Sequence, residues 1–182
     1  MKTIFKISGS FAEQQLLFRS LSGSEAISAL YEFKLQFLCE DISFDANSLI
    51  GSEITLTIDI ESKQRYLSGL VTRIKRLGKE TLTKRYYIFE ATIRPWLWLA
   101  TQTNQYHIHQ KKNIPQVIQE TLEDYPFELE FRTVGSYREW GYCVQYDETD
   151  FEFVSRLMEH EGLYYWFEHE LGQHKLVIAD EI

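Results

Sequence analysis

Two neighbouring histidines are the residues whose type and spacing best suit metal chemistry. In His107-Ile108-His109 the two rings are two positions apart, so on a β-strand they would share one face. A catalytic zinc site uses three protein ligands and one open position. No third ligand is identifiable beside this pair, which favours surface or packing histidines. A histidine-based metalloenzyme on His107 and His109 stays an alternative function.

The other three histidines have structural interpretations. His160 would stand in the last turn of a predicted helix, where a positive charge suits the helix dipole. His169 and His174 flank Leu171-Gly172, and a hairpin turning there would place them opposite each other. We expect a solvated hairpin end at this pair rather than a metal.

Motifs for other chemistry are missing. The sequence has no phosphate-binding G-x-x-x-x-G-K-S/T or G-x-G-x-x-G loop, no G-x-S-x-G and no H-E-x-x-H. Cys39 and Cys143 lie in apolar runs without a C-x-x-C pair, which predicts two buried thiols. We expect no catalytic residue, no cofactor and no metal site.

A basic face on two neighbouring strands supports a second alternative, a small-barrel module that binds nucleic acid. Its residues would be Arg73, Lys75, Arg76, Lys84 and Arg85. Small barrels are a common scaffold for nucleic acids. However, residues 1–90 carry 12 basic and 11 acidic side chains, so the field around the face is weak. We therefore expect a solvated or protein-binding face and no nucleic acid partner.

Composition is that of an ordinary globular protein with many aromatic residues. The 182 residues are 44% hydrophobic, 25% charged and 15% aromatic, which excludes disordered and fibrous classes. The net charge of −8 lies in residues 147–182, where ten acids stand against Arg156 and Lys175. That segment is also rich in aromatic residues, so it is not a disordered acidic tail.

Alternating patterns before Pro95 predict about five short strands in a small antiparallel sheet or barrel. In the segment 31–37, the side chains of Tyr31, Phe33, Leu35 and Phe37 would share one buried face. The segment 54–60 would be half-buried, with its threonines in solvent. The segments 67–77 and 84–94 would form a hairpin around Gly78.

Helical signals follow Pro95. Asn113, Pro115 and Gln116 predict the start of one helix, and Thr149-Asp150-Phe151-Glu152 is a capping box that starts a second, ended by Gly162. A last hairpin, from 163–167 and 175–179, would be apolar on both faces. It must be covered by the rest of the chain or by another subunit.

Several segments together resemble VgrG, the spike protein family of bacterial type VI secretion systems. The most specific segment runs from Tyr142 to Phe167 and contains YCVQYDETDFEFVSRLMEHEGLYYWF. Further motifs are Ser68-Gly69-Leu70-Val71-Thr72, IRPWLWL at 93–99 and NIPQVI at 113–118. The resemblance runs in order from about Ser22 to Asp180.

The resemblance implies a fold and a mechanical role. It implies a mainly β, α+β chain, with a small antiparallel tail-tube-like β-barrel at 1–95. An α+β insert at 96–182, with two helices and a C-terminal β-hairpin, would follow. The implied role is a hub module, not an enzyme, that trimerises and caps the secretion tube for delivery of effectors into target cells.

The family also implies partners and a location. The partners would be two further copies of the chain, the tube of haemolysin-coregulated protein, and effectors or tip proteins. The protein would assemble in the bacterial cytoplasm and then be secreted into the target cell or medium. The second barrel and the needle of the family would lie beyond Ile182, so we expect effector, tip and membrane contacts to depend on parts absent from this chain.

Overall fold

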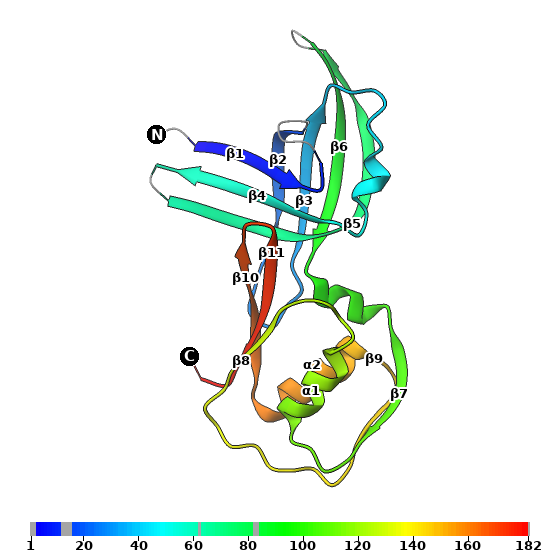
Figure 1. Ribbon diagram of the computed structural model, residues 1–182, viewed down its shortest axis with the longest axis vertical. Coiled ribbons are helices and arrows are strands. Elements are labelled where there is room, and N and C mark those ends of the chain that lie inside the picture. The colour runs from blue at the N-terminus through cyan, green and yellow to red at the C-terminus, as the bar shows by residue number, and fades with distance from the viewer. Residues whose placement is uncertain (1–2, 12–15, 62, 82–83, 182) are drawn as a thin grey trace. The chain divides into compact units, whose positions relative to one another are not determined.

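Strands dominate the computed structural model, which describes residues 3–11, 16–61, 63–81 and 84–181. The chain forms two units (Figure 1). The first comprises Met1–Glu25, Tyr31–Pro95 and His169–His174, and the second comprises Ala26–Leu30, Trp96–Glu168 and Lys175–Ile182. None of the helices in the described part of the chain has the length and apolar composition of a membrane span. The predicted mainly β, α+β fold class is confirmed.

The first unit is one antiparallel sheet of six strands in the order β1-β4-β5-β6-β3-β2. Its elements are β1 (Thr3–Gly9), β2 (Leu17–Ser24), β3 (Glu32–Cys39), the 3₁₀ turn η1 (Ala46–Leu49), β4 (Glu53–Ile60), β5 (Lys63–Thr81) and β6 (Arg85–Arg94). Strand β5 is long enough to pair with β4 over its first part and with β6 over its second. This strand therefore joins the two parts of a curled sheet (Figure 1).

The core of the first unit lies on the predicted face of β3. Tyr31 and the side chains of Phe33, Leu35 and Phe37 are all buried, as their spacing predicts. Phe37 stacks on Phe89 of β6 with the ring centroids 5.6 Å apart. Burying each such side chain contributes about 1.5–3 kcal/mol.

One local prediction for the first unit is wrong, and one strand was missed. Gly78 is not a hairpin turn, because β5 continues through a bulge there to Thr81. Strand β2 was not predicted, because its exposed pattern lacks a continuous apolar face.

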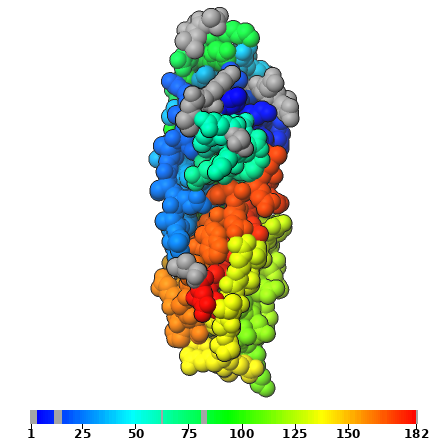
Figure 2. Space-filling view, turned by 90° about the vertical axis from the view of Figure 1, so that its left-hand side faces the viewer, coloured from blue at the N-terminus to red at the C-terminus, as the bar shows by residue number. Residues whose placement is uncertain are grey.

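The second unit contains two helices, a two-stranded ribbon and a three-stranded sheet. The elements are the 3₁₀ helix η2 (Trp96–Thr101), β7 (Asn104–His109), α1 (Ile114–Leu122), β8 (Leu129–Arg132), β9 (Cys143–Thr149), α2 (Asp150–Glu161), β10 (Tyr164–Glu170) and β11 (Gln173–Ala179). β7 pairs with β9, and β11 lies between β10 and β8. Figure 2 shows this order as red between orange and yellow surface.

Both predicted helices begin directly after the residues predicted to cap them, Asn113 and Thr149. The Asn113 side chain accepts from the Gln116 N–H, and the Thr149 hydroxyl accepts from the Glu152 N–H. In return, the side chains of Gln116 and Glu152 accept from the backbone N–H of Asn113 and Thr149, which completes each capping box. Gly162 ends α2 in the left-handed conformation, with φ 72°, which costs glycine little.

Candidate functional site

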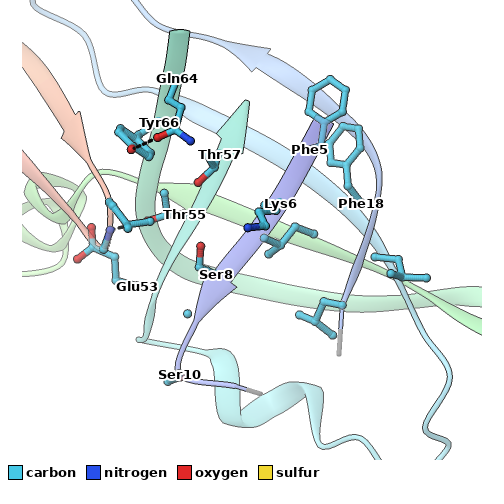
Figure 3. A pocket seen from close by; sticks show the side chains of 16 residues that line it. Phe5, Lys6, Ser8, Ser10, Phe18, Glu53, Thr55, Thr57, Gln64 and Tyr66 are labelled. Atoms are coloured by element: carbon cyan, nitrogen blue, oxygen red, sulfur yellow. Dashed lines mark hydrogen bonds between the residues drawn. The ribbon is translucent and has the colours of Figure 1, made fainter. Parts of the chain in front are cut away.

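A hollow in the first unit has a volume of about 790 Å³ and lies beside the two end strands of its sheet, β1 and β2. β1 and β2 are the end strands of the sheet order, and no ladder joins them in the described residues. The rings of Phe5 and Phe18 stack across this seam with centroids 4.2 Å apart. The hollow is lined by both seam strands, by β4 and β5, and by Leu171 and Gly172 (Figure 3).

One wall of the hollow is polar. Lys6 of β1 is opposite Thr57 of β4, and Thr57 is opposite Tyr66 of β5, so the three side chains form a row across the strands. The Tyr66 hydroxyl donates to Gln64, and the Gln64 amide donates to Asp59, at 2.7 Å each. The only carboxylate among the described lining residues is Glu53.

The tip of the last hairpin, residues His169–His174, is bound beside this wall by buried polar groups of β4 and β5. The Gly172 N–H donates to the Thr55 hydroxyl oxygen (3.0 Å), and the Ser68 hydroxyl donates to the Glu170 carbonyl (2.6 Å). Thr55 and Ser68 also bind each other at 2.8 Å. β4 is therefore buried on both faces here, and the prediction that Thr55 and Thr57 face solvent is wrong.

The side chains of both tip histidines have little exposure to solvent, which corrects the prediction of a solvated hairpin end. His174 is fully buried and its Nδ1–H donates to Glu53 (2.6 Å). The Nε2–H of His169 donates to Glu25 (2.9 Å), which leaves Nδ1 free to accept from the Ser68 N–H (3.0 Å). Both rings thus hold the tip in the first unit. The prediction failed because their partners are more than 100 positions away.

The arrangement favours binding and positioning over catalysis. The described groups that line the hollow include no pair of carboxylates and no nucleophile beside a free base. Burial and two nearby carboxylates, Glu53 and Glu25, raise the pKa of Tyr31, and its hydroxyl donates to the Ser68 carbonyl (2.6 Å). Tyr31 is therefore a neutral donor that fixes β5.

His107 and His109 do lie side by side, with ring centroids 4.4 Å apart. His109 is buried and its Nδ1 lies 3.1 Å from Glu120, which also binds Lys112. Burial lowers the pKa of His109, and its contact with Glu120 acts in the opposite direction. Among the described residues, no group of three or more His, Cys, Asp or Glu is arranged to hold a metal.

The predicted basic face is divided. Arg73 and Lys75 share the side of β5 whose cross-strand partners are Thr92 and Glu90, whereas Arg76 is opposite the buried Phe89. The Arg76 guanidinium lies over the Tyr87 ring at 4.4 Å. Lys84 is paired with Glu40, which holds the pKa of that carboxyl below its usual range. These contacts remove the continuous patch that the nucleic acid alternative requires.

The body of the last hairpin is covered by this chain. Val177 and Ala179 of one hairpin face are buried, and Tyr164 and Trp166 on the same face are half-buried. On the same face, Glu130 and Glu168 bind Arg132 and Lys175. The Arg132 guanidinium lies 5.7 Å from the Trp166 ring centre. Burial within the chain therefore accounts for Leu176 to Ala179 of β11, whereas Tyr164 and Trp166 of β10 remain half-buried.

The chain matches known proteins over nearly all of its length. The model of the phage tail baseplate hub (GPD) family matches residues 24–182. The type VI secretion system spike protein VgrG1c of Pseudomonas aeruginosa is 37% identical over 167 residues, which are 91% of this chain and 23% of that protein. The chain thus spans about a quarter of the length of the curated relatives it matches. The resemblance to VgrG is confirmed.

Solved structures have the same fold. The Escherichia coli c3393 protein is described as a type VI secretion component with similarity to the T4 phage tail proteins gp27 and gp5. It matches with a TM-score of 0.85 and 21% identity, over 97% of this chain and 49% of that one. A chain of the Francisella PdpA–VgrG complex matches with a TM-score of 0.66 and 12% identity, over 99% of this chain and 31% of that one.

Proposed function

The chain belongs to the phage tail baseplate hub (GPD) family, and from this premise we propose that it is the hub module of a type VI secretion spike. In this role it trimerises within the complete spike protein and caps the secretion tube. Residues 1–95 form the tail-tube-like barrel, and residues 96–182 form the α+β insert. The tube of haemolysin-coregulated protein is the partner that this module contacts.

The observation that carries the proposal is the open seam of the six-stranded sheet. β1 and β2 each leave one edge without a ladder among the described residues. Ile4, Phe5 and Leu17 expose large apolar side chains beside that seam. Unpaired strand edges with apolar side chains are typical of surfaces that assemble with further chains.

The module is structural rather than enzymatic. Thr55 and Glu53 of the hollow bind the hairpin tip, and His109, His169 and His174 each pair with a single carboxylate. The spike protein assembles in the bacterial cytoplasm and leaves with the secreted tube. Effectors and tip proteins bind parts of the spike outside this chain.

The proposal is tested in a chimera in which this chain replaces the matching residues of VgrG1c. We expect the chimera to co-purify with the tube protein of the same bacterium. Ile4→Asp and Leu17→Asp place charges at the seam and should each weaken this association by about tenfold or more. Ile42→Asp, at an exposed isoleucine away from the hollow, is the matched control.

Two results would contradict the proposal. One is a folded chimera that never binds the tube protein, although VgrG1c binds it in the same assay. The other is equal loss of binding in the seam variants and in Ile42→Asp, because a general effect of added charge would then explain the result.

A further inference from the structure

Strand β7 has a free edge that is exposed on both faces. Residues 104–108 are all exposed, and only His109 at the end of the strand is buried. β7 pairs with β9 on one side, and the other side has no strand partner in the described part of the chain. The strand contains no Lys, Arg, Asp, Glu or Pro, the residues that commonly block such edges.

The outer edge of the partner strand is not equally free. The Arg156 guanidinium donates to the Val144 carbonyl of β9 at 3.2 Å and also binds Glu148. β9 has no second ladder among the described residues either, but this side chain is bound to its backbone, so β7 is the freer strand of the ribbon.

One face of the ribbon is apolar and uncovered. Tyr106 is 67% exposed and Tyr146 is 74% exposed, and their rings meet edge to face with centroids 5.3 Å apart. Ile108, opposite Val144, continues this face along β7 and is also exposed. An added strand would find apolar contacts at alternate positions of β7, at Tyr106 and Ile108.

The opposite side of β7 borders an acidic hollow of about 130 Å³. Gln105 and His107 of β7 line it together with Glu120, Glu123, Asp124 and Asp150. Asp150 is already bound by the Tyr125 hydroxyl and the Gln145 amide, both at 2.8 Å, and Glu120 by Lys112. Glu123 and Asp124 are exposed and have no ion pair with a described residue.

A buried polar atom provides a second sign that this hollow is incomplete. The His109 side chain is only 3% exposed and lines the hollow. Its Nδ1 contacts Glu120, but its Nε2 has no hydrogen-bond partner among the described residues. Buried polar atoms in proteins rarely stay unpaired, because leaving one unsatisfied costs free energy.

We propose that β7 is a docking edge for an extended segment of a partner protein in which apolar and basic residues alternate. The segment pairs with the β7 backbone as a third strand of the ribbon. Its apolar side chains contact Tyr106 and Ile108. Its Lys or Arg side chains, on the opposite face, reach the carboxylates of Glu123 and Asp124. This inference does not depend on the proposed role in a secretion spike.

The test is a titration of the 182-residue chain, followed through its backbone amide resonances. The probe is a ten-residue peptide that alternates valine and lysine. One control peptide alternates valine and glutamate, and a second is the valine–lysine peptide with two prolines in place of valines. We expect the first peptide to shift the amides of residues 104–109. Both controls should bind about tenfold more weakly or not at all.

Two double variants test the two faces separately. Tyr106→Thr with Ile108→Thr, and Glu123→Gln with Asp124→Asn, should each weaken binding about tenfold. Val134→Thr and Glu139→Gln, at exposed positions away from the ribbon, should leave binding unchanged. All six positions are exposed, and unchanged thermal unfolding checks that each variant is folded.

Three outcomes would overturn the inference. The first is no shift at residues 104–109 with millimolar valine–lysine peptide, and the second is equal binding of the valine–glutamate peptide. The third is a concentration-dependent dimer that Ile108→Thr abolishes, because a second copy of this chain would then occupy the edge.

Discussion

The Nδ1 atom of His174 lies 2.6 Å from Oε1 of Glu53, which is 121 positions earlier in the chain. The histidine is fully buried, and the glutamate lies at the start of β4. Together with the contacts of Thr55 and Ser68, this bond fixes residues 169–174 to the sheet of the first unit. A segment from the end of the chain thus completes a unit built mainly from its beginning.

Glu53→Ala should destabilise the protein by about 1–3 kcal/mol, because it removes the carboxylate that the buried imidazole binds. Glu53→Gln keeps an acceptor oxygen and should lose less. The free energy of unfolding in urea measures both effects. Glu139→Ala, at an exposed glutamate, is the control, and a loss in Glu53→Ala no larger than in this control would contradict the role of the bond.

Gly69→Ala should destabilise the first unit, because an added Cβ would lie 2.7 Å from Ile93 Cγ2 and 2.8 Å from the Arg94 carbonyl and the Tyr31 hydroxyl. We expect a cost of about 1–3 kcal/mol from this overpacking. Gly78→Ala is a matched control on the same strand, since nothing lies within 4 Å of its Cβ position. Equal unfolding free energies for the two variants would show that the close approach at Gly69 is relaxed in solution.

Thr149→Ala should cost about 1 kcal/mol, because the hydroxyl that accepts from the Glu152 N–H is lost. Thr149→Ser retains that oxygen and should stay close to the parent protein. Urea unfolding, read by circular dichroism, distinguishes the two. If the serine variant lost as much as the alanine variant, the cap would not be the cause.

Acid should remove the contribution of Glu130 to stability. Hydrogen bonds from Arg132 and Lys175 lower the pKa of Glu130 to about 2, compared with about 4.3 in an unfolded chain. Because the folded pKa is the lower one, the stabilisation is complete above about pH 4.3 and disappears as the pH falls to about 2. The difference in unfolding free energy between the parent and Glu130→Gln should therefore be constant from about pH 7 to 5 and then shrink.

Salt provides the control for this prediction. Glu130 is partly solvent-exposed, so added salt should also reduce the difference at neutral pH. A difference that is independent of both pH and salt would exclude the ion pairs as its source.

Local patterns predicted the elements whose stabilising contacts are close in sequence. The alternation of β3 gave the correct buried face, and the capping box at Thr149 gave the correct start of α2. Gly162 was correctly placed at the end of that helix. In each case, neighbouring residues carry the periodicity or form the bonds that define the element.

Contacts between distant segments could not be predicted in this way. Thr55 and Thr57 alternate with Ile54 and Leu56, which is also the pattern of a solvent-facing strand. Thr55 is buried where its hydroxyl accepts from the Gly172 N–H, and a contact with so distant a segment is invisible to local periodicity. The Ser68-Gly69 pair was the one available signal, since glycine inside a strand often marks the close approach of another backbone.

Electron cryomicroscopy of the VgrG1c chimera mixed with the tube protein would show directly whether this module caps the tube. We expect tubes that end in a cap, with the six-stranded sheet of this chain in a ring seated on the last layer of the tube. Tubes without a cap, or a cap in which residues 1–95 lie outside the ring, would contradict the proposed role.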